Sequence, residues 1–203
     1  METFLVLLQI SIGAVFIQNF VLSRFLGLCP FFGISKKLSS AFGMGLAVTF
    51  IMVASTIFTW TVNRFILVPH HIEYFQTIVF VLVIAALTQI VEMAIKKHSP
   101  MLYDSLGVFL PLMATNCAIM GVAVLNVEIN QFTGMPFSFI EAMVNSFMSG
   151  VGVILALVLM AGIRERLELA NIPKVFDGLP IAFITAGLMA IAFLGFAGMS
   201  IGG

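Results

Sequence analysis

Apolar residues fill most of this chain in long runs that do not alternate with polar positions. A transmembrane helix needs about 20 mostly apolar residues, and unalternating runs of this length favour helices over half-exposed strands. The pattern predicts six membrane-spanning helices, at residues 4–21, 41–62, 75–95, 106–125, 139–163 and 179–201. The predicted fold class is therefore an all-α integral membrane protein.

Polar and proline-containing segments separate the predicted spans. Asn63 and Arg64, followed by Pro69, are expected to end the second span, and the charged run 164–168 is expected to end the fifth. The segment 126–136 separates the fourth span from the fifth. Proline ends helices because it lacks an N–H donor and restricts the residue before it.

Composition excludes several classes of protein. Of the 203 residues, 61% are hydrophobic and 9% are charged, whereas a soluble domain has roughly 25% charged residues. So few charges cannot cover a water-exposed surface, which excludes an ordinary soluble enzyme, a nucleic-acid-binding protein and a disordered segment. The net charge is zero, so no polybasic surface is expected.

Basic residues indicate how the chain is oriented. Eight of the nine Lys and Arg residues fall in the first, third and fifth predicted loops: Arg24, Lys36, Lys37, Lys96, Lys97, Arg164, Arg166 and Lys174. Only Arg64 lies on the other side. Because cytoplasmic loops carry the excess of Lys and Arg, both termini are predicted to lie on the outer, periplasmic side of the cytoplasmic membrane.

Six spans divide into two halves of three, and a three-span unit begins and ends on opposite sides of the membrane. If residues 1–100 and 101–203 are pseudo-repeats within one membrane domain, 1–203, the second must be inverted relative to the first. Inverted repeats commonly place functional groups near the midplane on discontinuous helices. We therefore expect a broken first helix in each half.

The first half contains such a break. Its apolar region, 4–34, would be about 46 Å long as one helix at 1.5 Å per residue, longer than the hydrocarbon core. It also contains Asn19, Arg24, Gly27 and Pro30. Pro30 disfavours helical geometry at Cys29, so we expect a helix, a break and a short apolar segment that re-enters the membrane.

The second half has a counterpart in the span 106–125. Pro111, Thr115 and Asn116 interrupt this span, and Cys117 follows directly. The two cysteines of the chain thus occupy matching positions beside the two breaks. Residue-level similarity between the halves is weak, so the match is one of position.

Three interpretations of the cysteines remain open from the residues alone. A buried free cysteine often acts as a small hydrophobic residue, and an internal disulfide would require Cα atoms within about 7 Å. The third interpretation is metal ligation, because thiolates suit iron and iron–sulfur clusters. Such sites usually use four thiolates, so two cysteines would require a site shared with another chain.

Two segments resemble a known family. The stretch 19–37, NFVLSRFLGLCPFFGISKK, and the stretch 110–118, LPLMATNCA, are similar to the two cysteine motifs of the RnfA/NqrE family. The resemblance covers the whole chain. Cys29 is followed by Pro-Phe-Phe-Gly, which favours the RnfA branch over the NqrE branch.

The resemblance implies a specific role. RnfA-type chains are membrane-embedded electron-transfer subunits of Rnf, the ion-translocating ferredoxin:NAD oxidoreductase of bacteria, and are not catalytic alone. By this resemblance, Cys29 and Cys117 would be ligands of a 2Fe–2S cluster shared with a homologous, oppositely oriented RnfE-like subunit. Six further residues are candidates to support the cluster or an ion path: Asn19, Arg24, Gly27, Pro30, Thr115 and Asn116.

Other parts of the complex follow from the same resemblance. FMN, NAD and further iron–sulfur clusters would belong to other subunits, among them RnfB, RnfC, RnfD and RnfG. A charge is costly at the centre of a bilayer, so redox change at Cys29 and Cys117 is expected to alternate access for Na⁺ or H⁺. The alternatives are an NqrE-type subunit of a sodium-pumping NADH:quinone oxidoreductase, a non-redox secondary transporter with inverted repeats, and a scaffold subunit.

Overall fold

The computed structural model describes residues 2–34, 38–70, 73–98, 115–127, 137–170, 173, 176 and 178–197, and no strand occurs among them. Seven longer segments are α-helical: α1 (Glu2–Ile12), α2 (Leu28–Ile34), α3 (Leu38–Val62), α5 (Gln76–His98), α8 (Cys117–Leu125), α9 (Phe139–Glu168) and α10 (Leu179–Ala197). Short elements extend them: η1 (Gly13–Ile17), η2 (Asn63–Leu67), α4 (Val68–His70) and η3 (Glu73–Phe75). The predicted all-helical class is confirmed.

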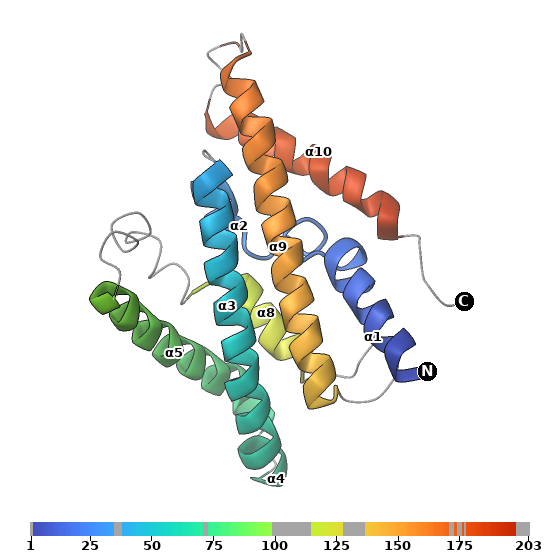
Figure 1. Ribbon diagram of the computed structural model, residues 1–203, viewed down its shortest axis with the longest axis vertical. Helices are drawn as coiled ribbons and strands as arrows, with labels where there is room; N and C mark the ends of the chain where they lie inside the picture. The colour runs from blue at the N-terminus through green and yellow to red at the C-terminus, as the bar shows by residue number, and fades with distance from the viewer. Residues whose placement is uncertain are drawn as a thin grey trace.

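Two long helices, α3 and α9, form the centre of the molecule and lie side by side (Figure 1). They pack closely because small residues face the partner helix. A Cβ atom on Gly45 would lie 2.7 Å from Ile154 Cγ1, and one on Gly150 would overlap the side chain of Thr49. Small residues allow helix backbones to approach in this way in membranes.

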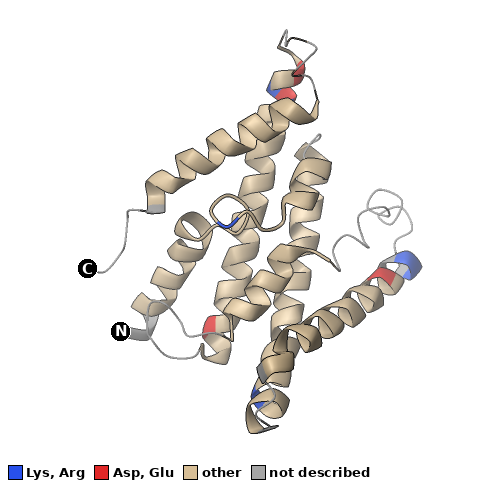
Figure 2. Ribbon diagram, turned by 180° about the vertical axis from the view of Figure 1, so that it is seen from behind, with Lys and Arg blue, Asp and Glu red and all other residues tan. Residues whose placement is uncertain are grey.

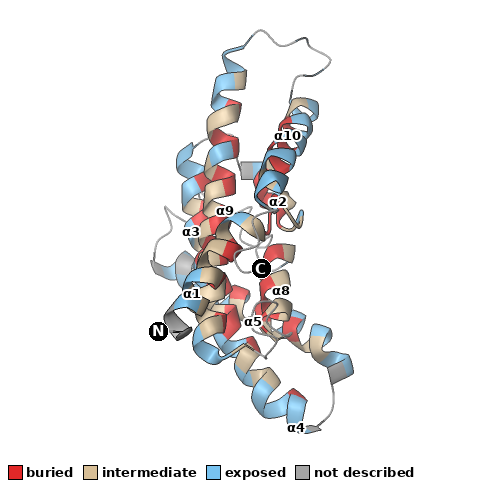
Figure 3. Ribbon diagram, turned by 90° about the vertical axis from the view of Figure 1, so that its right-hand side faces the viewer, coloured by how far each residue is buried: buried red, intermediate tan, exposed pale blue. Residues whose placement is uncertain are grey.

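The core lies where α3 and α9 meet α2 and α8 (Figure 3). The side chains from these four helices include Phe31, Met44, Val48, Ile119, Val122, Val153 and Met160, and the loop 20–22 and one face each of α5 and α10 add further members. In contrast, α5 and α10 present large apolar side chains outward, among them Ile78, Leu82, Leu188 and Ile191. Apolar residues on an outer surface are typical of helices that face lipid or another membrane chain.

Three described helices are long and apolar enough to cross a membrane: Leu38–Leu67, Gln76–Ala94 and Phe139–Glu168. They correspond to the second, third and fifth predicted spans. Shorter apolar helices, Leu5–Ile17 and Leu179–Leu194, cover parts of the first and sixth. Of the fourth span, residues 106–114 and the predicted break at Pro111 lie outside the described residues. Charged residues gather near the ends of the long helices (Figure 2), as a membrane protein requires.

Several predicted helix ends differ from the structure. The first span, predicted to end at residue 21, ends at Ile17, where the chain enters the predicted break. The second span continues through Asn63 and Arg64 to His70. Pro69 has no N–H to donate to the preceding turn. The wider π-turn η2, just before Pro69, allows the helix to continue without that hydrogen bond. The fifth span continues to Glu168, since Arg and Glu are good helix formers once the chain has left the apolar region. At 30 residues, α9 is about 45 Å long.

Candidate functional site

The first predicted break lies between Ile17 and Leu28, and Asn19 holds it together. Asn19 is fully buried, and its Nδ2 donates to the carbonyls of Val15 (3.1 Å) and Gly152 (3.0 Å). Its Oδ1 accepts from the backbone N–H groups of Val21 and Leu22. One side chain therefore satisfies the backbone groups that the broken helix leaves free, and fixes the loop to α9.

Gly27 connects this loop to the second half of the chain. Its backbone N–H donates to Cys117 Sγ, with the nitrogen 2.9 Å from the sulfur. Gly27 has φ +84°, and a Cβ atom there would lie 3.1 Å from Ala118 Cβ. Glycine is required here both for the backbone conformation and for the close approach to α8.

In the second half, α8 begins at Cys117, directly after Asn116, one of the residues that the sequence predicts to interrupt the fourth span. Asn116 has an extended backbone (φ −68°, ψ 112°), and its Oδ1 accepts from the N–H of Ala118 at 3.0 Å. It is therefore the N-cap of α8, and Cys117 is the first residue of this helix. The positive end of the α8 dipole consequently lies at Cys117, where it favours negative charge.

Cys29 is the second residue of α2 and is exposed, whereas Cys117 is half-buried; both are free thiols. Because Gly27 contacts Cys117 and lies two residues before Cys29, the two cysteines occupy the same region of the fold. Our expectation that Pro30 makes Cys29 non-helical is wrong. Pro30 sits in the first turn of α2, where its missing N–H would have no intrahelical partner in any case.

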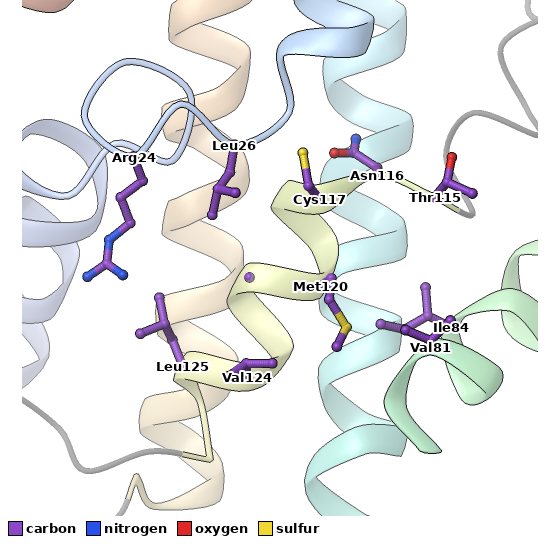
Figure 4. Close-up of a pocket in the computed structure, with 11 residues that line it drawn as sticks. Arg24, Leu26, Val81, Ile84, Thr115, Asn116, Cys117, Met120, Val124 and Leu125 are labelled. Atoms are coloured by element: carbon purple, nitrogen blue, oxygen red, sulfur yellow. The ribbon is translucent and has the colours of Figure 1, made fainter. Parts of the chain in front are cut away.

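An open pocket of about 640 Å³ adjoins Cys117 (Figure 4). Arg24 lies across it from Cys117, and Thr115 and Asn116 complete its polar part. The half-buried Arg24 contacts Gln18 Oε1 (3.4 Å) and lies 5.9 Å from the centroid of the Phe20 ring. The rest of the lining is apolar: Leu26, Val81, Ile84, Met120, Gly121, Val124 and Leu125.

One residue that fixes α2 was missed by sequence reasoning. Arg164 is buried in α9, and its Nη1 donates to the carbonyl of Phe32 at 2.9 Å. It thereby holds the last turn of the helix that carries Cys29, where a cation is favourable. In the sequence this arginine belongs to a charged run that is typical of a water-exposed helix end, so no local signal identifies its role.

Cys29 and Cys117 are the two thiols of the chain, and thiols are the soft donors that could ligate a metal ion. Among the described residues, no group of three or more His, Cys, Asp or Glu side chains could hold a metal ion. The exposed Cys29 can reach an atom outside this chain. Phe25, four residues earlier in the loop that precedes α2, is also exposed and has a left-handed backbone (φ 57°). Such a conformation is rare for a bulky residue and is characteristic of functional loops.

Comparisons with known proteins identify the family of this chain. Residues 7–200 match the family described as "Rnf-Nqr subunit, membrane protein". The chain is 55% identical over 193 residues to the A subunit of the ion-translocating oxidoreductase complex of Syntrophotalea carbinolica, and the match covers 95% of this chain and 97% of that protein. It is also 55% identical over 196 residues to the A subunit of the Na⁺-translocating ferredoxin:NAD⁺ oxidoreductase complex of Acetobacterium woodii, covering 97% and 99%.

A third relative is the A subunit of the ion-translocating oxidoreductase complex of Edwardsiella ictaluri. It is 52% identical over 192 residues, which is 95% of this chain and 96% of that protein. The resemblance inferred from the two cysteine motifs is therefore confirmed over nearly the full length. The chain belongs to the Rnf-Nqr family of membrane subunits.

Proposed function

We propose that this chain is a membrane-embedded electron-transfer subunit of an ion-translocating ferredoxin:NAD oxidoreductase, to which it contributes half of a 2Fe–2S site. Two relatives that are 55% identical are named as the A subunits of ion-translocating oxidoreductase complexes. The structural observation that carries the proposal is the hydrogen bond from Gly27 N–H to Cys117 Sγ. It brings the two cysteine-containing segments of the chain together.

The donor set fits a shared cluster. Thiolates are the usual ligands of iron–sulfur clusters, four to a cluster, and this chain has two cysteines. Two more would come from a homologous, oppositely oriented RnfE-like subunit. The exposure of Cys29 supports sharing, since a ligand enclosed within this chain could not contribute to an interface. When bound, a 2Fe–2S cluster would supply one-electron transfer at membrane depth.

The chain's own residues would stabilise the negative charge of this site. The N–H of Gly27 and the N-terminal end of α8 both direct partial positive charge at Cys117. Asn19 holds the first break and Asn116 caps α8. Pro30 lies in the first turn of α2, and Arg24 and Thr115 line the adjoining pocket. None of these residues is proposed to react chemically.

The membrane arrangement belongs to the same proposal. We infer six spans in two inverted repeats, 1–100 and 101–203, with both termini on the outer side of the bacterial cytoplasmic membrane. The positions of the basic residues and the apolar outer faces of α5 and α10 support it. FMN, NAD and further iron–sulfur clusters would be held by other subunits (RnfB, RnfC, RnfD and RnfG), and Na⁺ or H⁺ would be the ion moved.

Substitution of each cysteine in the purified complex tests the proposal. Cys29→Ser and Cys117→Ser should each remove one 2Fe–2S electron paramagnetic resonance signal and the corresponding iron and acid-labile sulfide, and should abolish ferredoxin-driven ion uptake. Met120→Leu is the matched control, because it removes a sulfur atom from the same pocket without removing a thiol. Full iron content and full ion uptake in the serine variants would contradict the proposal.

A further inference from the structure

A second group of polar side chains gathers at the other end of α8 from Cys117. Asn126, the C-cap of α8, donates from Nδ2 to Ser146 Oγ (2.7 Å) and to Thr56 Oγ1 (3.2 Å). These two hydroxyl oxygens are 2.6 Å apart, and Asn145 Nδ2 donates to Asn126 Oδ1 at 2.8 Å. We call these four residues the outer polar cluster; α3, α8 and α9 meet there.

Hydroxyl groups in membrane helices usually bond to their own backbone, and this chain follows the rule with two exceptions. Among the described residues, the other buried Ser and Thr hydroxyls all donate to the carbonyl four residues earlier: Thr49, Thr56, Thr59, Thr88, Ser146 and Thr185. Ser55 and Ser149 are 1% and 0% exposed, and their Oγ atoms have no hydrogen-bond partner within the described part of the chain. A buried polar atom without a partner is costly and calls for a specific explanation.

Both unpartnered serines are close along the helices to members of the outer polar cluster. Ser55 directly precedes Thr56 in α3, and Ser149 lies one turn after Ser146 in α9; both serines are buried. The contact between Thr56 and Ser146 sets the register of the two helices at this level. Two buried hydroxyls with unused hydrogen-bonding capacity therefore lie within one helical turn, along α3 and α9, of a cluster that contains two hydroxyls and two amides.

The electrostatics of α8 favour a cation at this end. The helix has nine residues and is about 13 Å long, with Cys117 at its positive end and Asn126 at its negative end. Figure 4 shows Cys117 and Leu125 at opposite ends of this helix. In membrane transporters, the C-terminal ends of such half-helices coordinate cations, because their carbonyls carry partial negative charge.

The cluster can present oxygen atoms to a cation after the side-chain amides of Asn126 and Asn145 both rotate. Nδ2 of Asn126 now faces the two hydroxyls, and a half-turn of the amide would direct Oδ1 at them instead. Asn145, the partner of Asn126 Oδ1, is also an amide and can accept as well as donate. Hydroxyl and amide oxygens are hard ligands, which suit small hard cations.

We propose that Ser55, Thr56, Asn126, Ser146 and Ser149 form a sodium-binding site at the C-terminal end of α8. This inference deepens the proposed function, on which it rests, by assigning the transported ion a site about one half-helix away from the cysteines. Negative charge at Cys117 would then attract a cation to the opposite end of the same short helix. The serine hydroxyls would gain the partner that they lack.

The double variant Ser55→Ala with Ser149→Ala tests the site with little risk to folding, because the deleted hydroxyls have no partner among the residues that the structure describes. Electron transfer from ferredoxin to NAD⁺ by the purified complex is titrated with NaCl, with choline chloride holding the ionic strength constant. We expect the half-saturating Na⁺ concentration to rise by about tenfold or more, as the loss of two ligands implies. The matched control is Ser11→Ala, which deletes a hydroxyl that bonds to the Leu7 carbonyl in α1; its titration should match the unmodified complex.

Failure of the sodium site and failure of the proposed function would give different results. An unchanged half-saturating concentration in the double variant, or an unmodified complex whose electron transfer does not depend on Na⁺, would overturn the sodium site. Absence of a 2Fe–2S signal from the unmodified complex would instead contradict the proposed function, and the sodium titration would still decide the site independently. If the double variant does not assemble, Ser149→Ala alone is titrated under the same criterion.

Discussion

The contact between Gly27 and Cys117 joins positions 90 residues apart in the chain. A single backbone N–H thus connects the loop that precedes Cys29 with the thiol of the second half. This geometry requires a residue without a side chain, because φ is +84° and Ala118 lies close by. The conformation of one residue therefore determines whether both cysteine segments can share a site.

Replacement of Gly27 by alanine should weaken that connection. A positive φ costs an L-residue roughly 1–2 kcal/mol, and the new Cβ would lie 3.1 Å from Ala118 Cβ. We expect a lower thermal unfolding midpoint for the purified complex and a smaller 2Fe–2S signal. Gly43→Ala in α3 is the control, since nothing lies within 4 Å of its Cβ position and alanine favours a helix. Equal midpoints for the two variants would argue against a constrained Gly27.

At the scale of elements, α2 is held at both ends. Gly27 fixes the chain just before it, and Arg164 donates to the carbonyl of Phe32 near its end. A seven-residue helix is too short to be stable by itself. Its position therefore depends on these two contacts and on the burial of Phe31 in the core.

The variant Arg164→Gln should release the C-terminal end of α2. The shorter, neutral side chain would leave the Phe32 carbonyl without its charged donor, at a cost of roughly 1–3 kcal/mol. Hydrogen exchange of the backbone amides in α2 should become faster. Arg166→Gln makes the same chemical change at an exposed position of the same helix and should leave that exchange unchanged. Similar exchange in both variants would show that Arg164 does not hold α2.

Close packing of α3 against α9 gives a further prediction. In Gly150→Ala, the new methyl group would overlap Thr49, whose Oγ1 and Cβ atoms lie 2.6 Å and 2.8 Å from the Cβ position. We expect a loss of about 1–3 kcal/mol, measured as a lower thermal unfolding midpoint, and partial recovery when Thr49→Ala is added. Gly162→Ala in the same helix has nothing within 4 Å and serves as the control. If Gly150→Ala is as stable as Gly162→Ala, the two helices do not pack tightly at Thr49.

The sequence predicts the elements better than it predicts the contacts between them. Hydropathy identifies α3, α5 and α9 as spans, and Asn116 before Cys117 marks the start of α8 through its capping chemistry. By contrast, the sequence pattern predicts a loop at Asn126, which is buried, and a helix end at Arg164, which is buried as well. Their roles depend on residues 20 to 132 positions away, and no local pattern encodes such distances.

At the scale of the whole molecule, the charge distribution matches a protein that lies in a membrane. The middle of the long helices contains few charged residues, which gather toward their ends (Figure 2). Most buried polar side chains of the described residues are instead neutral, and those of the outer polar cluster and Asn19 are hydrogen-bonded. Arg24 is charged, unlike these neutral groups. It lies on the loop beside Cys117 (Figure 4), where its positive charge would stabilise negatively charged thiolates.

A chain with two cysteines and an exposed Cys29 should not retain a cluster by itself. Expressed without its homologous partner, it is expected to purify with little iron and no 2Fe–2S signal, because two of four ligands would be missing. Co-expression with the partner should restore two iron atoms per pair of chains, and co-expression with a partner that lacks its own cysteines should not. A stable cluster in the isolated chain would show that this chain completes the site without the partner, and sharing across the interface would have to be abandoned.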